Sequence, residues 1–281
     1  MHNNKETMPE LTLLIDSKLG RNRSADGSTF EYPLEPALMV PFDAEPALRV
    51  LEANVFYTSP NVSVAKSNNR LKFSVITSGT VAGGDLSTHT HSVVFDDGLY
   101  SLADINAELA DMLERKDTIA DAALSFVGHG PTQTVIADWD AEAATYGVIL
   151  RFSETESIAP LLGFAATDLT YEVSEGGKHK YFRSPSPANF DAVSLYLLNC
   201  SVLSGQNYDA SGSGGGQVAC AITPDVRPGN LIQYRPLVPL PCQAHALKGN
   251  CTSSIRFTMT DNNNEPVSLN EAYTARILIS W

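Results

Sequence analysis

The chain of 281 residues is poor in charged side chains. Asp, Glu, Lys and Arg make up 18% of it, against roughly 25% in average globular domains. No run of Lys and Arg occurs, and 19 basic against 32 acidic residues give a formal net charge of −13. Such a chain repels phosphate backbones at long range, so direct binding of nucleic acid is not expected.

Long hydrophobic runs are also missing. No stretch of about 18 or more apolar residues is present, so no membrane-spanning helix is expected. The polar start MHNNKETMPE has no apolar segment of the kind that forms a signal peptide. Hydrophobic residues nevertheless make up 43% of the chain. That content is enough for a substantial folded core and is not typical of a disordered chain.

Cysteine is scarce, and its spacing does not fit common metal motifs. The four cysteines are Cys200, Cys220, Cys242 and Cys251, and no two of them form a Cys-x-x-Cys pair. Structural zinc sites need such closely spaced ligands, so a zinc site is not expected. Because no signal peptide is visible, we expect free, buried thiols of the kind that a reducing cytosol maintains.

Candidate catalytic and metal-binding residues are few and isolated. His89 and His91 occupy alternate positions of an expected strand and could share a metal, but no third ligand is near in sequence. Asp138 and Asp140 are spaced as a carboxylate pair, for which solvated acids at a strand end are the commoner explanation. The stretch 261–264 lacks the alternating acids and final Glu of a calcium loop and is interpreted as a turn. We expect no catalytic, cofactor-binding or metal site, although a Cys–His pair that meets only in space stays open.

One segment has the pattern of an amphipathic helix. Ser101 can cap its first turn, with Asp104 beside the positive end of the helix dipole. The sequence therefore predicts one helix over about 101–116. Its apolar side chains recur at three- and four-residue spacings, which places them on one face: Leu102, Ile105, Leu109 and Met112–Leu113.

The rest of the chain is strand-like. Short β-type runs alternate with Gly, Pro, Asn and Asp turn signals, which favours a β-sandwich or jelly roll over an α/β fold. One hairpin is predicted between 62–65 and 71–76, and a second between 132–140 and 146–153. Pro33, in an alternating run, indicates an edge strand. The stretch 226–241 is rich in proline and must run extended.

No internal repeat or clear linker divides the sequence. The most linker-like segment, 204–217, is rich in Gly and Ser, which cannot pack a core, and it lies inside the strand pattern. Its run at 211–216 lacks the Lys-Ser/Thr of a phosphate-binding loop. We therefore expect one domain over residues 1–281, with long loops and a flexible Gly/Ser loop at 204–217.

The sequence ends on strand-like runs at 254–260 and 273–281 rather than on a polar tail. In a jelly roll, a terminal strand pairs with strands distant in sequence, so Trp281 is expected to be held in place. Deletion of the last several residues should then remove a sheet strand and prevent assembly.

Four segments occur in an order that is shared with a known group of proteins. They are a strand, loop and strand at 13–38, a helix entry at 95–113, the step APLLGF at 159–164, and the ending SIRFTMTDNNNEPVSLNEAYTARILISW. The ending combines an apolar strand, a turn, a Pro-Val-x-Leu-Asn step and a last strand. Together these segments resemble the penton-type minor capsid proteins of virophages and polinton-like viruses.

The resemblance implies a mainly β, single jelly-roll capsid subunit, the penton protein that forms homopentamers at the fivefold vertices of an icosahedral shell. Its implied partners are copies of itself and the double-jelly-roll major capsid protein, and its implied location is the virion capsid, assembled inside the host cell. No enzymatic activity or cofactor is implied. The alternative is a carbohydrate-binding or host-attachment β-sandwich module, in which loop aromatics such as Tyr208 stack on sugars.

Overall fold

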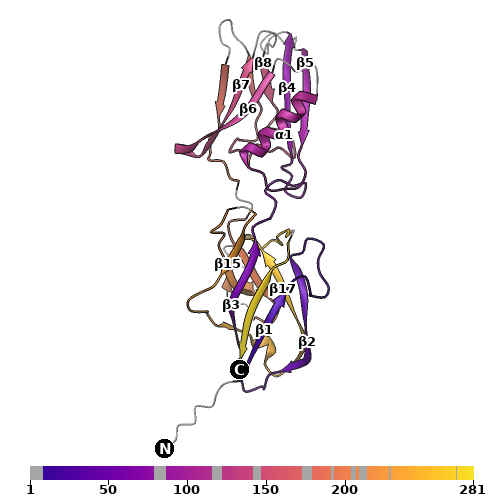
Figure 1. Cartoon of the computed structure of the whole chain (residues 1–281), viewed down its shortest axis with the longest axis vertical. Helices are drawn as coiled ribbons and strands as arrows, with labels where there is room; N and C mark the ends of the chain where they lie inside the picture. Colours follow the sequence, from indigo (N-terminus) through magenta and orange to yellow (C-terminus); the bar gives the residue numbers. More distant parts are fainter. Residues whose placement is uncertain are drawn as a thin grey trace, which may run out of the picture. The chain divides into compact units, whose positions relative to one another are not determined.

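The chain folds into two compact units. The computed structural model describes residues 9–78, 87–115, 122–141, 147–172, 179–190, 193–203, 207–208, 214–227, 229–269 and 271–281. Unit 1 comprises Met1–Ser59 and Val193–Trp281, and unit 2, Pro60–Ala192, is inserted into it (Figure 1). This division differs from the single domain expected over residues 1–281. The insertion escapes sequence analysis because both units consist of short strands, and no change of composition marks the junction.

Unit 1 is a sandwich of two antiparallel sheets (Figure 1). Its strands are β1 (Glu10–Asp16), β2 (Thr29–Met39), β3 (Ala47–Phe56), β11 (Tyr196–Cys200), β14 (Val218–Ile222), β15 (Leu231–Tyr234), β16 (Cys242–Gln243), β17 (Cys251–Thr260) and β18 (Thr274–Ser280). The first sheet has the order β1-β18-β3-β15, with β16 also paired to β3. The second has the order β14-β11-β17-β2.

The pairing in unit 1 is that of a jelly roll. Its eight principal strands, taken in chain order, pair first with eighth, second with seventh, third with sixth and fourth with fifth. The pairs β18·β3 and β11·β17 then join these four ladders into two sheets. Such nested antiparallel pairing over two sheets defines the fold. The predicted mainly β, jelly-roll fold is confirmed, and unit 2 is inserted between the third and fourth principal strands.

The end of the chain lies inside a sheet, as expected. β18 is hydrogen-bonded to β1 on one side and to β3 on the other. Its inward residues Ala275, Ile277 and Ile279 are at most 1% exposed. In the second sheet, β2 is an edge strand, which confirms the position inferred from Pro33.

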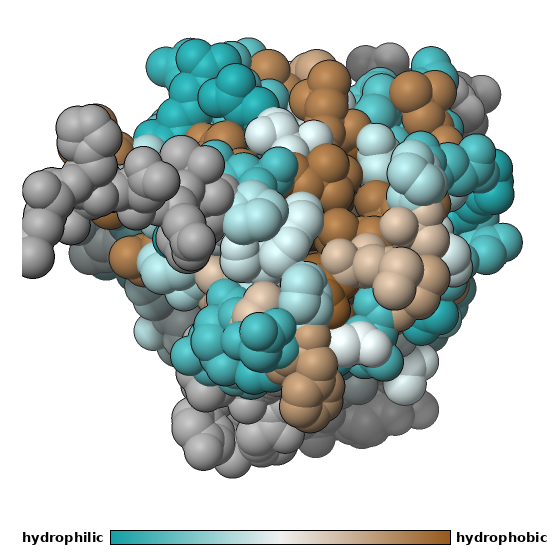
Figure 2. All heavy atoms as spheres, turned by 90° about the horizontal axis from the view of Figure 1, so that it is seen from below, coloured by the Kyte–Doolittle hydropathy of each residue, from teal (hydrophilic) through white to brown (hydrophobic). Residues whose placement is uncertain are grey.

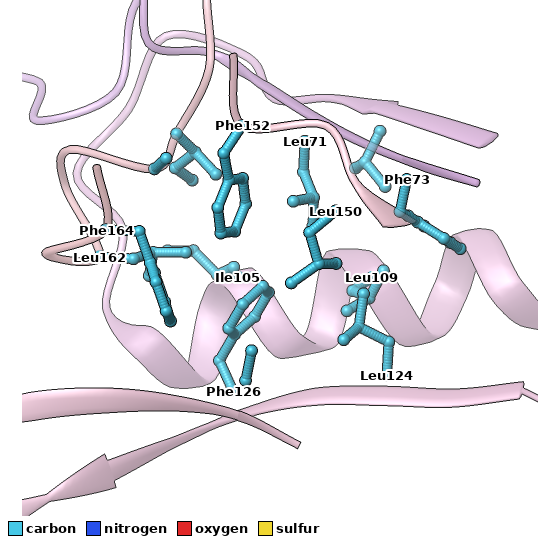
Figure 3. Close-up of a cluster of buried hydrophobic side chains, with 14 of the residues drawn as sticks. Leu71, Phe73, Ile105, Leu109, Leu124, Phe126, Leu150, Phe152, Leu162 and Phe164 are labelled. Atoms are coloured by element: carbon cyan, nitrogen blue, oxygen red, sulfur yellow. The ribbon is translucent and has the colours of Figure 1, made fainter. Parts of the chain in front are cut away.

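Unit 2 is a smaller sandwich with one α-helix among its described residues. Its elements are β4 (Arg70–Ser78), β5 (Ser87–Val94), α1 (Leu102–Arg115), β6 (Ala122–His129), β7 (Thr134–Ala141), β8 (Gly147–Leu150), β9 (Leu169–Glu172) and β10 (His179–Arg183). The sheets have the orders β5-β4-β8-β9 and β10-β7-β6. Figure 3 shows side chains of β4, β6, β8 and α1 pointing toward one another, and they form one buried cluster.

Helix α1 begins with the predicted cap. The Ser101 hydroxyl and backbone N–H both donate to Asp104 Oδ2, at 2.7 and 2.8 Å. These bonds hold the pKa of Asp104 below its usual value. Further along, the Asn106 side chain donates to the Phe126 carbonyl and accepts from its N–H, both at 2.8 Å. The Asn106 side chain therefore links α1 to β6, because it forms hydrogen bonds with both backbone groups of Phe126.

Both predicted hairpins are wrong. Residues 62–65 form no strand, because the Asn68 side chain accepts from Ser63 N–H and donates to the Asn61 carbonyl, which folds the segment into a turn. β4 pairs instead with β5 and β8. β7 and β8 lie in different sheets, since each finds its neighbours elsewhere in the chain.

The predicted Gly/Ser loop is described only in part. Within 204–217, the structure describes β12 (Asn207–Tyr208) and β13 (Gly214–Gly216), which form a short antiparallel pair, and Gln217. The remainder of this loop lies outside the described residues.

Candidate interaction surfaces

The candidate metal-binding and carboxylate residues lie on strands β5 and β7. On β5, His89 is exposed, whereas His91 is buried beside Phe73, with ring centroids 5.3 Å apart. Among the described residues, no group of three or more His, Cys, Asp or Glu is placed to hold a metal ion. Asp138 lies within β7 opposite Ser125, not at a strand end, and the Asp140 side chain is outside the described set.

The stretch 261–264 is a turn, as interpreted from sequence. The Asp261 carboxylate accepts from the N–H groups of Asn263 and Glu265, at 2.8 and 3.0 Å. Asn264 adopts a φ of 63°, which Asn tolerates better than most residues. The carboxylate therefore closes its own turn.

Two of the four thiols are buried in unit 1. All four cysteines are free; Cys200 and Cys220 are buried, Cys242 is half-buried and Cys251 is exposed. Burial raises the pKa of Cys200 to about 12, and it raises the pKa of Cys220 as well. Such thiols stay protonated at neutral pH and are not nucleophiles. The prediction of buried thiols is confirmed for these two and is wrong for Cys251.

Unit 2 has a hollow with few ionisable side chains in its lining. It has a volume of about 410 Å³ and lies between the start of α1, the β6–β7 connection and residues 188–190. His129 is its one ionisable lining residue, and its Nδ1 is 2.8 Å from the Thr132 hydroxyl. General acid–base catalysis needs a titratable group aimed at a bound substrate, and one of the two ring nitrogens of His129 is in contact with a neighbouring threonine.

The first prominent surface of unit 1 is an apolar loop, residues 235–241, between β15 and β16. Leu237 is fully exposed, and Val238 and Leu240 are 75% and 74% exposed. At its base, the Arg235 guanidinium donates twice to Glu52 Oε1, at 3.2 and 2.8 Å, and holds the pKa of that carboxyl below its usual value. Large apolar side chains are thus held in solvent on an anchored loop.

The second surface is an edge groove of about 570 Å³ between β1 and β2. It is lined by consecutive residues, 10–13 of β1 and 32–39 of β2, together with Arg21 and Trp281. Because β1 and β2 each end their sheet, this groove is bounded by two strand edges. Figure 2 shows unit 1 from the side on which Figure 1 draws the C-terminus, and hydrophobic residues form a band across that face.

These surfaces fit protein contacts better than catalysis. Contiguous exposed apolar side chains mark interaction sites, because leaving them in water forgoes the gain from burial. Sequence reasoning missed both surfaces. The groove depends on two strands that are positioned by partners over 200 residues away. The loop has a readable signal, three large apolar residues between prolines, but the prolines by themselves indicate only an extended chain.

The fold and these surfaces define a class, a jelly-roll protein with a second β unit inserted between its third and fourth strands. The crystal structure of the mavirus penton protein is similar to it, with a TM-score of 0.53 and 13% sequence identity. The similarity covers 98% of this chain and 99% of that chain. The resemblance to penton-type proteins is therefore confirmed at the level of the fold.

The comparisons by sequence give no match. No protein-family model matches the chain, and no curated protein does. Within the part of the chain that the structure describes, no helix is long and apolar enough to cross a membrane.

Proposed function

We propose that this chain is the penton protein of a viral capsid, which forms homopentamers at the fivefold vertices of an icosahedral shell. The observation that carries the proposal is the extent of the structural similarity, 98% of the chain, which spans the inserted unit 2 as well as the jelly roll. A jelly roll alone hosts many functions, including lectins. A structural similarity that extends over both the jelly roll and the inserted unit of this chain is much more restrictive.

The surface chemistry supports this proposal. A subunit enclosed by neighbours needs a stiff scaffold and weakly charged flanks, and only 18% of this chain is charged. The apolar loop and the edge groove are two different patches of unit 1, as a cyclic ring requires. The proposed partners are further copies of the chain and a double-jelly-roll major capsid protein, in the virion capsid, assembled inside the host cell. This role requires no catalysis and no cofactor.

The acidic balance supports a place in the shell rather than on the genome. With a net charge of −13 and no basic run, the chain has no electrostatic means of holding phosphate backbones. We therefore propose no direct contact with nucleic acid.

Native mass spectrometry of the purified protein tests the oligomer. We expect a species of five times the 30.3 kDa chain mass, and five-membered rings in negative-stain electron microscopy. Co-expression with the major capsid protein should place the chain at vertices of assembled shells. A protein that stays monomeric at all concentrations, binds a sugar on a glycan array and is left out of shells would contradict the proposal.

A further inference from the structure

We propose that the apolar loop of one copy binds in the edge groove of the next copy, so that the ring is held by a head-to-tail contact. This inference rests on the proposed assembly of the chain into a ring. It names the two surfaces of unit 1 that meet and the occupant of the groove, a second copy of the same chain.

The two surfaces lie on opposite edges of the same sheet. β15 and β16, which flank the apolar loop, pair with β3 on one side of the sheet. β1, which borders the groove, ends the sheet on the other side, beyond β18. Figure 1 likewise draws β15 and β2 on opposite sides of unit 1. Because a copy cannot fold its own loop across the sheet, the loop is available to a neighbour.

The two surfaces also lie at the same level along the strands. The loop leads into β16, whose first residue, Cys242, is opposite Leu48 of β3. Leu48 is opposite Ile279 of β18, and Ile279 is opposite Leu11 of β1, which lines the groove. A head-to-tail contact closes into a ring only when successive copies are related by rotation without a rise along the axis; otherwise it builds a filament. Because the loop and the groove lie at the same height along the strands, successive copies can be related by a rotation about an axis parallel to the strands, with no rise along it.

The chemistry of the loop suits that of the groove. Leu13, Leu34 and Leu38 are buried at the groove and give it an apolar floor. Edge strands offer backbone N–H and C=O groups, to which an extended segment can add hydrogen bonds. Three prolines, at 236, 239 and 241, hold the loop extended, so it loses little conformational freedom on binding.

Site-directed cross-linking tests the contact directly. The variant carries Val238→Cys on the loop and Ala37→Cys in the groove, with Cys251→Ser to remove the exposed native thiol. Mild oxidation by dioxygen with a copper catalyst removes two thiol hydrogens per pair and forms a disulfide between copies. We expect a ladder from dimer to covalent pentamer on non-reducing gels. The matched controls are the two Cys251→Ser variants that carry only one of the introduced cysteines, and each should stay monomeric on the same gel.

Charge insertion supplies an independent measurement. Leu237→Asp with Val238→Asp should raise the concentration needed for half-assembly by at least about tenfold, because two apolar anchors are replaced by charges that must be desolvated. The matched control is Val64→Asp, an exposed apolar residue of unit 2 at 62% exposure, which should assemble as the wild type does. Circular dichroism checks that each variant keeps its fold.

The outcomes separate this inference from the proposed function. Wild-type pentamers that give no cross-link, and that tolerate both aspartates, would overturn the loop-in-groove contact and leave the penton proposal intact. A wild type that forms no ring at any concentration contradicts the proposed function itself, and the inference falls with it.

Discussion

At the scale of single residues, the four cysteines differ in how deeply their thiols are buried, which the sequence alone does not show. Cys200 and Cys220 are buried and Cys251 is exposed, while burial raises the pKa of the half-buried Cys242. The reactive form is the thiolate, which an apolar surrounding disfavours. We predict that a maleimide at pH 7 labels Cys251 first. Peptide mass mapping over time measures the order of labelling; equal rates at all four sites would contradict the burial argument.

A buried tyrosine connects stability to high pH. The Tyr196 hydroxyl is 2.9 Å from the Ser59 hydroxyl, and burial raises the pKa of Tyr196 from 10.0 to about 12. Below pH 10 the phenol is neutral in both the folded and the unfolded state, so its contribution is complete. Between pH 10 and 12 it ionises preferentially in the unfolded chain, and folding stability is lost as pH rises.

We therefore predict that the midpoint of thermal unfolding falls between pH 10 and 12, and that Tyr196→Phe falls less steeply. At pH 8 the same variant should lose roughly 1–2 kcal/mol, because the Ser59 hydroxyl is left without its partner. Thermal melts followed by circular dichroism at a series of pH values check both effects. An unchanged pH slope in Tyr196→Phe would assign the loss to other groups.

At the scale of elements, the contact between α1 and β6 depends on one amide side chain. Asn106 exchanges two hydrogen bonds with the backbone of Phe126. We predict that Asn106→Ala costs about 1–3 kcal/mol of unfolding free energy, because a strand N–H and C=O lose their partner. Hydrogen exchange at the Phe126 amide should quicken. Glu108→Ala, an exposed position on the same helix, is the control and should leave that amide protected.

Local patterns in the sequence predict elements, and long-range contacts decide how the elements pair. The spacing of Leu102, Ile105 and Leu109 predicts α1, because a helix buries one face of its own residues. The residues near 62–76 include a turn signal, but nothing there indicates that the Asn68 side chain bonds back to Asn61 and Ser63, or that β4 pairs with β5 and β8. The edge groove is equally hidden, since β17 and β18 position β2 and β1 from the far end of the chain. An interaction surface of this kind follows from topology rather than from any motif.

At the scale of the whole molecule, a nested jelly roll makes the fold depend on strands at both ends of the chain. Three of the four principal pairs in unit 1, β1·β18, β2·β17 and β3·β15, join an early strand to a late one, and β1·β18 is the outermost. Unit 2 is inserted between β3 and β11, which belong to different pairs, just outside the innermost pair β11·β14. An insertion there interrupts no ladder, which explains how one jelly roll accommodates a second core.

The last strand should accordingly be indispensable. Deletion of 274–281 removes the partner of both β1 and β3 and exposes the core that Ile277 and Ile279, both 0% exposed, now fill. Loss of two fully buried isoleucines alone costs several kcal/mol, comparable with the net stability of a domain. We predict that the truncated chain is insoluble or unfolded and forms no ring, as seen by size-exclusion chromatography and circular dichroism. Trp281→Ala, which leaves β18 whole, should stay folded, and a truncated chain that still assembled would show that β18 is dispensable.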